Sequence, residues 1–407
     1  MTASQWERAV AHEWLDGREE ANAAKCRYAA DFTSATVRFF KQHVTTPGDA
    51  SDVASFLKST LERCDELSFD DPPAALAYLL WHQVDRYHRV TQALDRLFLH
   101  GLLPLAKSNR PLRVLEVGSG PAPASYAVID YYAALAAWTK SRGERFQTSP
   151  LAEAHTLDRG GAWQSVVHGL SEQLLNTEDR QSVREGGPRR SRFFGITYHE
   201  FAKFSPIQLH IDEREKVKRE LINEDGYLAC FDQLSVEQQA ARSAPPSAYD
   251  LIIVANFVTT PSMMAGLKTE LENLANSLVP GGVLLTLSGD SKKYEDLWAE
   301  YAVLPTVKRL DHLLDEVVQA HEDPAIRERV ARATIDLLAH INELDGPGLD
   351  IEQLPTDVAE AMRTALFSPP SLTDDPGITY PKFQLHGFVR RFGRSLQKGA
   401  RGTSRTS

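Results

Sequence analysis

The chain has 407 residues, of which 42% are hydrophobic and 25% charged, the composition of an ordinary globular protein with room for two or three domains. Its net charge is −10, and six bases with no acids lie between Arg390 and Ser407, so the rest of the chain carries −16. A body this acidic argues against nucleic acid as a partner, because binding a phosphate backbone rests on Lys and Arg contacts. The basic end, residues 393–407, is interpreted as a disordered tail.

No apolar run approaches membrane-spanning length, and the N-terminus lacks a basic segment followed by an apolar one. We therefore expect a cytoplasmic protein with no membrane partner. Cys26, Cys64 and Cys230 are odd in number and widely spaced, which argues against a disulfide framework and against structural zinc. No metal site is predicted.

Residues 1–106 are predicted to form an N-terminal helical domain or lid. Apolar residues recur at spacings of three and four in 51–67 and again in 74–103, and the Asp70-Asp71-Pro72-Pro73 cluster separates the two runs. The second run contains an aromatic stripe. Such a stripe packs in a core or covers a ligand, and the sequence leaves both readings open for Tyr78, Trp81, Tyr87 and Phe98.

From 107 to 290 the pattern alternates between strands and helices. Strands are predicted at 113–120, at 152–160 with Asp158 near its end, at 192–201, at 249–258 and at 283–289. Helices are predicted between them, at 125–139, 162–176 and 264–279, and a Pro280-Gly281-Gly282 turn leads into the last of these strands. This alternation predicts an α/β fold with a doubly wound, mostly parallel sheet.

Residues 291–392 are predicted to form a helical segment followed by a final strand. Helical periodicity occupies 294–304 and 324–344, and a strand pattern occupies 380–392. No sixth strand is located between residue 290 and this final strand.

The first predicted strand runs into a glycine loop, Gly118-Ser119-Gly120-Pro121-Ala122, and then into a helix. Strand, glycine loop and helix bind nucleotides, because glycines let the backbone approach the ligand and a helix N-terminus offers free N–H groups. A dinucleotide loop has a third small residue for close packing of helix and strand. Here the acid Glu116 precedes Gly118 by two positions, which suits a ligand with a cationic ammonium and sulfonium.

VLEVGSGPAPAS resembles motif I of the class I, Rossmann-like S-adenosylmethionine-dependent methyltransferases, a hydrophobic strand, an acid and then Gly-x-Gly-x-Gly. Ala122 stands where the third glycine of the family falls. YDLIIVANF and LENLANSLVPGGVLLTLSG resemble the family's fourth strand, the following helix and the turn into the fifth strand, in the correct order. The resemblance covers 111–290. It implies a seven-stranded-type sheet with an N-terminal helical domain and a C-terminal helical insertion before the last strand.

The resemblance also implies S-adenosylmethionine as cofactor and a set of residues that contact it. Glu116 and the glycine loop lie against the methionine moiety, and Asp158, unless it is only a surface acid, binds the ribose hydroxyls. His199 and Asn256 act on the methyl acceptor, His199 as the proton acceptor, with His82 and His88 as further candidates. The implied cofactor-binding set is Glu116, Gly118, Ser119, Gly120, Pro121, Ala122, Asp158, Glu200, Phe201, Asn256 and Phe257.

Methyl transfer to the oxygen or nitrogen of a small molecule is the predicted reaction, with an acceptor pocket between the N-terminal helices and the segment after Gly289. Three alternatives stay open. An RNA methyltransferase fits the basic tail, a nicotinamide-dependent oxidoreductase fits the glycine loop, and a non-catalytic cofactor-binding regulator fits the missing third glycine. The sequence names neither the acceptor atom nor the oligomeric state.

Overall fold

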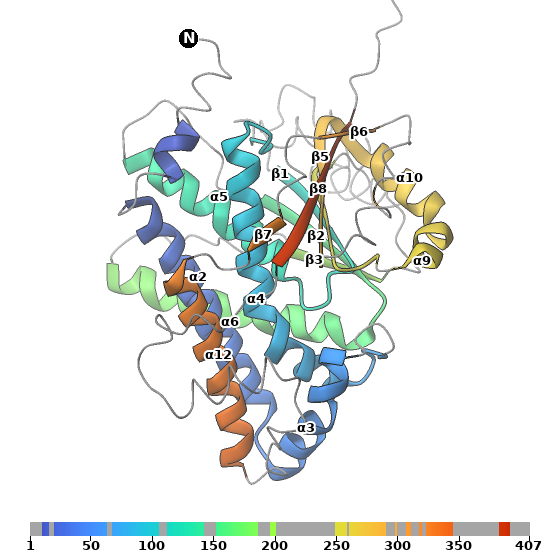
Figure 1. The fold of residues 1–407 in the computed structure, drawn as a ribbon. Coiled ribbons are helices and arrows are strands. Elements are labelled where there is room, and N and C mark those ends of the chain that lie inside the picture. The colour runs from blue at the N-terminus through green and yellow to red at the C-terminus, as the bar shows by residue number, and fades with distance from the viewer. Residues whose placement is uncertain are drawn as a thin grey trace, which may run out of the picture.

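The computed structural model describes residues 10–15, 20–62, 67–105, 112–141, 152–185, 196–200, 249–258, 260–289, 298, 307–310, 317–319, 323–344 and 382–390. These residues form a mostly parallel sheet with helices on both faces and an additional helical layer (Figure 1). The predicted tail at 393–407 lies outside this part of the chain, as do residues 201–248.

The N-terminal part is helical, as predicted. It contains α2 (Glu20–His43), α3 (Pro47–Glu62) and α4 (Pro72–Leu99). Helix α4 begins with two prolines after Asp71, because the first helical positions need no backbone N–H. The acidic and proline-rich cluster therefore separates α3 from α4, as the sequence indicated.

Five strands form the parallel part of the sheet, in the order β3-β2-β1-β4-β5. They are β1 (Leu112–Val117), β2 (Ala152–Asp158), β3 (Ile196–Glu200), β4 (Tyr249–Ala255) and β5 (Leu278–Gly289). Every residue of β4 is buried, which is usual for a parallel strand covered on both faces. The predicted doubly wound, mostly parallel sheet is confirmed in these strands.

The sheet continues beyond β5 with antiparallel strands. Strand β8 (Lys382–Arg390), the predicted final strand, pairs antiparallel with β5. Two strands of three residues each, β6 (Val307–Arg309) and β7 (Val317–Gln319), both pair antiparallel with β8. The described sheet thus has eight strands, one more than a seven-stranded sheet, because two short strands share β8 as a neighbour.

The turn predicted at Pro280-Gly281-Gly282 lies inside β5. Tyr249 pairs with Leu278 and Leu251 with Val283, so the register between β4 and β5 shifts across this segment. Gly281 has φ +83°, a value that side chains disfavour. The prediction of a turn was therefore right about the local backbone and wrong about the start of the strand.

Helices α5 (Pro123–Ser141) and α6 (Gly161–Glu185) lie on one side of the sheet, and α9 (Pro261–Gly266) and α10 (Lys268–Ser277) lie on the other (Figure 1). Right-handed crossovers require this switch of sides where the strand order reverses, between β1 and β4. Ligands of such sheets bind beyond the carboxyl ends of the strands at this switch point.

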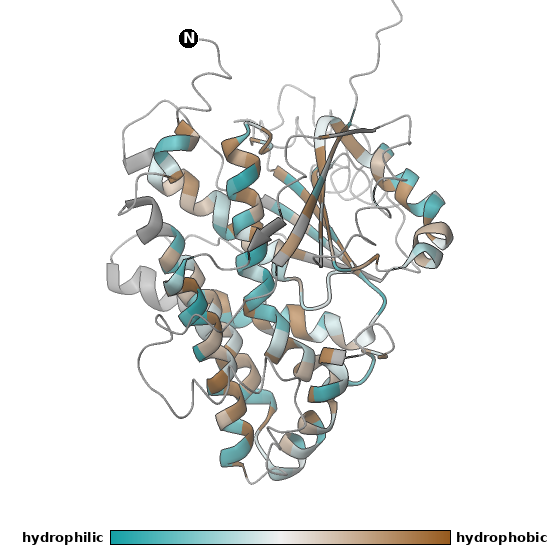
Figure 2. Cartoon of the chain, viewed as in Figure 1, coloured by the Kyte–Doolittle hydropathy of each residue, from teal (hydrophilic) through white to brown (hydrophobic). Residues whose placement is uncertain are grey.

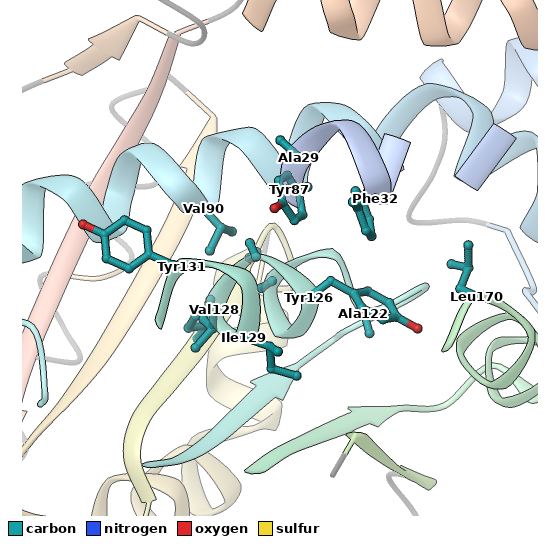
Figure 3. Close-up of a cluster of buried hydrophobic side chains, with 14 of the residues drawn as sticks. Ala29, Phe32, Tyr87, Val90, Ala122, Tyr126, Val128, Ile129, Tyr131 and Leu170 are labelled. Atoms are coloured by element: carbon teal, nitrogen blue, oxygen red, sulfur yellow. The ribbon is translucent and has the colours of Figure 1, made fainter. Parts of the chain in front are cut away.

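The N-terminal helices cover α5, and α5 covers the sheet. Figure 3 shows Ala29, Phe32 and Tyr87 facing the side chains of α5, and Phe32 stacks on Tyr87 with ring centroids 4.3 Å apart. One continuous hydrophobic core contains residues of α2, α4, α5, α6 and the sheet. The predicted boundary near residue 106 therefore divides a shared core, and the division into domains stays a prediction.

Helix α12 (Pro324–Glu343), the predicted C-terminal helix, joins the N-terminal layer. Val330 and Ala333 pack against Val84 of α4, and the His340 ring lies 2.7 Å from the backbone oxygen of Val44. Brown apolar and teal polar residues alternate along α4 and α12 in Figure 2, as in helices that bury one face. Among the described helices, none is long and apolar enough to cross a membrane.

Candidate functional site

The glycine loop after β1 has a strained, left-handed backbone. Gly118, Gly120 and Ala122 have φ values of +64°, +51° and +59°. Residues with a side chain rarely adopt such values, because Cβ approaches the neighbouring carbonyl. Ala122 thus takes a left-handed conformation that glycine adopts more readily.

Glu116 supports the loop from the strand below. Its side chain is 1% exposed, and its carboxylate accepts hydrogen bonds from the backbone N–H of Ala124 (3.1 Å), the backbone N–H of Ser125 (2.7 Å) and the Ser125 hydroxyl (2.7 Å). Burial raises the pKa of Glu116 to about 7, although the hydrogen bonds from Ser125 and Ala124 oppose the rise. The carboxylate therefore holds the start of α5, and its predicted contact with the methionine moiety stays a prediction.

Asp158 supports the loop from the end of the neighbouring strand. Its Oδ2 accepts a hydrogen bond of 2.7 Å from the backbone N–H of Gly120, which lies 38 positions earlier in the chain. Its Oδ1 accepts from the N–H groups of Arg159 (2.7 Å) and Gly160 (3.1 Å). The structure thus brings together two predicted cofactor-binding positions, Gly120 and Asp158.

The end of β4 reaches the same loop. Asn256 has φ +52°, and its N–H donates a 2.8 Å hydrogen bond to the carbonyl of Leu287 in β5. The next residue, Phe257, lies directly on Gly118, since a Cβ added to Gly118 would be 2.3 Å from Phe257 Cδ2. Phe257 is therefore at the glycine loop and Asn256 directly precedes it, while the predicted contacts of both residues with the cofactor stay a prediction.

The end of β3 is placed by its backbone alone. His199 pairs with Leu157 and Glu200 with Asp158, while Phe201 and the side chains of His199 and Glu200 lie outside the described residues. Three strand spacings separate β3 from β4, about 14 Å at the usual distance between strands. The backbones of His199 and Asn256 are therefore three strands apart, and the action on the acceptor predicted for these two residues stays a prediction.

An aromatic wall, Phe69, Tyr78 and Trp163, lies beside the loop and was only partly anticipated. A Cβ on Gly120 would be 3.5 Å from the Tyr78 ring and 3.8 Å from the Trp163 ring. Phe69 lies 5.2 Å from Tyr78 and 4.8 Å from Trp163, measured between ring centroids. The stripe that contains Tyr78 thus packs in the core and against the glycine loop, and its role as a cover over a ligand stays a prediction.

The connection between α3 and α4 is fixed to the start of α6. Asp70 Oδ1 accepts a 2.7 Å hydrogen bond from the backbone N–H of Gly161, and the carbonyl of Phe69 accepts one of 3.1 Å from the N–H of Ala162. Because α6 begins just after Asp158, this contact joins the N-terminal layer to the strand end that supports the loop. Nothing in the sequence pairs Asp70 with Gly161.

A buried glutamine of α4 also reaches the loop. Gln83 is 0% exposed, and its Nε2 donates a 3.0 Å hydrogen bond to the carbonyl of Pro121. The available signal was a polar residue on the apolar stripe of α4, between Leu80 and Tyr87. Sequence reasoning did not use it.

Two polar atoms at the loop have no hydrogen-bond partner among the described residues. They are the amide oxygen of Gln83 and the hydroxyl oxygen of Ser119, and both are buried. Buried polar groups in native proteins nearly always have partners, so these two atoms call for an ordered water or a ligand. Among all the described residues, no cluster of three or more His, Cys, Asp or Glu side chains is placed to hold a metal ion.

A doubly wound sheet whose first strand enters a left-handed glycine loop at the switch point agrees with the fold that the resemblance to class I, Rossmann-like methyltransferases implied. No protein-family model matches the chain, and no curated protein sequence matches it.

Solved structures of methyltransferases are similar to the chain at low identity. A phosphoethanolamine N-methyltransferase 2 of Haemonchus contortus with S-adenosyl-L-methionine is 9% identical, with a TM-score of 0.31 over 83% of this chain and 60% of that one. A loganic acid methyltransferase with SAH is 11% identical, with a TM-score of 0.29 over 80% and 97%. The apo S-adenosylmethionine-dependent methyltransferase SibL is 13% identical, with a TM-score of 0.27 over 78% and 59%. Likenesses this distant identify no substrate.

Proposed function

We propose that the chain is an S-adenosylmethionine-dependent methyltransferase that methylates the oxygen or nitrogen of a small molecule. The observation that carries the proposal is the geometry of the glycine loop. Gly118, Gly120 and Ala122 are held in left-handed conformations by Glu116 below and Asp158 beside them, and Phe257 packs on the first glycine. The sequence pattern of motif I thus coincides with a supported loop at the ligand-binding edge of the sheet.

The residues present fit this cofactor. The buried amide oxygen of Gln83 accepts hydrogen bonds only, and the buried Ser119 hydroxyl both donates and accepts. An amino-acid moiety offers an ammonium donor and a carboxylate acceptor, so it suits both atoms. A pyrophosphate offers acceptors only and would leave Gln83 without a partner. This difference favours S-adenosylmethionine over a nicotinamide dinucleotide.

When bound, S-adenosylmethionine supplies a sulfonium methyl group that is open to in-line displacement. The chain contributes binding, alignment and exclusion of water. In this proposal the glycine loop and Ser119 hold the methionine end, Asp158 holds the ribose, and Phe257 with Asn256 borders the reacting carbon. His199 stays the proposed base. It is needed only where the group that receives the methyl must lose a proton.

Two observations weigh against the alternatives. Ala122 takes a left-handed conformation that glycine also adopts, so alanine at the position that favoured a non-catalytic regulator is compatible with a left-handed loop. The charge of −16 outside residues 390–407 opposes the binding of RNA. A small molecule is therefore the proposed acceptor, and the proposed location is cytoplasmic.

Equilibrium binding by calorimetry tests the cofactor. We expect S-adenosylmethionine and S-adenosylhomocysteine to bind and NADH not to bind. Asp158→Ala removes the support of Gly120 and the proposed ribose contact, so affinity for S-adenosylhomocysteine should fall at least tenfold, the effect of losing about 1.4 kcal/mol. The matched control is Asp323→Ala, which removes a carboxylate that caps α12 and should leave binding unchanged.

Tight binding of NADH without binding of S-adenosylmethionine would overturn the proposal. The acceptor class is tested separately, by release of S-adenosylhomocysteine in the presence of small-molecule pools or of RNA. Affinity for RNA that falls steeply with salt, together with RNA-dependent turnover, would replace the small-molecule acceptor with a nucleic acid.

A further inference from the structure

Helix α4 contributes a polar group to the glycine loop from outside the resemblance, which covers 111–290. The Gln83 side chain is fully buried, and its Nε2 lies 3.0 Å from the carbonyl oxygen of Pro121. A carbonyl only accepts hydrogen bonds, so the amide nitrogen has to face it. The orientation of the amide is therefore fixed, and its oxygen is directed away from Pro121.

That oxygen has no donor among the described residues. Leaving a buried acceptor unsatisfied costs about 1–3 kcal/mol. The Ser119 hydroxyl, two residues before Pro121, is 3% exposed and also without a partner in the described part of the chain. Two unsatisfied polar atoms are thus associated with the same five-residue loop, one on Ser119 within it and one on Gln83, which is hydrogen-bonded to it.

The chemistry of the pair defines the ligand group. Gln83 Oε1 requires a hydrogen-bond donor, and a cationic ammonium is the strongest donor that an amide oxygen meets. Asp158 lies beside the same loop and adds negative charge that favours a cation there. The group that fits is a primary ammonium.

We propose that Gln83 is a positioning residue for the amino-acid end of the cofactor, with its Oε1 accepting a hydrogen bond from the α-ammonium. This inference rests on the proposed function and extends it to a helix of the N-terminal layer. One amide then contacts the loop through its nitrogen and the cofactor through its oxygen, so cofactor binding is coupled to the position of α4.

The test compares two ligands on the full chain by calorimetry. S-adenosylhomocysteine carries the amino-acid end, whereas methylthioadenosine has the adenosine and sulfur without it. Gln83→Met keeps the length of the side chain and removes the amide. We expect affinity for S-adenosylhomocysteine to fall by about ten- to a hundredfold, the range for a hydrogen bond to a charged group. Affinity for methylthioadenosine should change less than about twofold, a difference worth under 0.5 kcal/mol.

The matched control is Tyr87→Phe. Tyr87 lies one turn further along α4, and its hydroxyl donates a buried hydrogen bond of 2.7 Å to Asp130, away from the loop. This variant should lower stability without changing the ratio of the two affinities. If Gln83→Met does not fold, Gln83→Asn retracts the amide by one methylene and should also weaken only S-adenosylhomocysteine.

The outcomes separate the inference from the proposed function. If the wild-type chain binds neither ligand, the proposed function fails. If it binds both and the Gln83 variants weaken both equally, the residue supports the nucleoside or the fold, and the inference is overturned. Unchanged affinity for S-adenosylhomocysteine in either variant also overturns it.

Discussion

At the scale of single residues, Glu116 shows how one carboxylate can serve the fold at the position where a family pattern assigns it to a ligand. An acid inside a buried strand was an informative feature of the sequence, and its location beside the glycine loop was predictable. Its three hydrogen bonds to Ala124 and Ser125 were not, because they depend on how α5 approaches the strand end. Removing the carboxylate therefore disturbs the start of α5 as well as the site.

The titration of Glu116 is expected to appear in the stability of the protein. Its pKa is about 7 in the folded state, above the ordinary value of 4.5, so the folded chain binds this proton more tightly than the unfolded chain. Stability from this group is present below pH 4.5 and is lost as the pH rises to about 7. Relative to Glu116→Gln, the wild-type free energy of unfolding should fall by about 3 kcal/mol across this window.

Urea unfolding of both proteins between pH 5 and pH 8 measures this difference. Asp49→Asn is the control. Hydrogen bonds from Thr45 and Thr46 lower the pKa of Asp49 below its ordinary value of 3.8. The stability that Asp49 contributes is lost only as the pH falls below this ordinary value, so its difference from wild type should stay flat in the measured range. A flat difference for Glu116→Gln would contradict the raised pKa.

At the scale of elements, the segment that follows β4 packs on the glycine loop, where the reacting end of the site is proposed. Gly118→Ala places a Cβ within 2.5 Å of three atoms of Phe257 and adds the strain of a side chain at φ +64°. Gly101→Ala is the matched control, because Gly101 has φ +67° and no heavy atom within 4 Å of the added Cβ. Strain alone costs about 1–2 kcal/mol.

We expect Gly101→Ala to lose only the stability that strain costs, about 1–2 kcal/mol, and to bind S-adenosylhomocysteine normally. Gly118→Ala should lose more stability and most of its affinity, because Phe257 has to move. The added substitution Phe257→Ala should restore part of the stability, since it removes the colliding ring. Urea unfolding measures the stability and calorimetry measures the affinity. Equal losses of stability in the two glycine variants would show that the Phe257 ring moves aside without a loss of free energy.

The strands and helices of the central part were largely predictable because their signals are local. Long apolar runs and three-to-four spacing gave β1, β4, α4 and α6 from the sequence alone. Strands β6 and β7 were missed, because three residues give no periodicity and their pairing with β8 depends on tertiary structure. The residues of the candidate site that lie in motif I and at the strand ends were predictable. Gln83, Phe69 and Asp70 were missed because they belong to the N-terminal helical layer.

At the scale of the whole molecule, the helical layer and the sheet share one core. Tyr131 of α5 donates a hydrogen bond to Asp95 of α4, and Tyr87 of α4 donates one to Asp130 of α5. A pattern of apolar residues shows which face of a helix is buried but not which partner covers it. The sequence therefore predicted the N-terminal helices, and it did not predict that α12 would join them.

Residues 107–407 are expected not to fold without the N-terminal helices. The shortened chain would expose Tyr126, Tyr131 and Tyr132 of α5, all at most 2% exposed in the full chain. Loss of a cover over this much aromatic surface removes several kcal/mol of hydrophobic stabilisation. Near-ultraviolet circular dichroism and urea unfolding should show no fixed aromatic packing and no cooperative transition. A fragment that unfolds cooperatively and binds S-adenosylhomocysteine would instead support an independent domain at 1–106.

The packing of α12 on the N-terminal layer also sets an order of events during synthesis. The contact between Val44 and His340 spans 296 residues, which take on the order of 15–60 s to translate at about 5–20 residues per second. Until then the faces of α2, α3 and α4 that α12 covers have no partner. Helices made first thus complete their packing last, so maturation of the protein should be limited by a late, long-range docking step.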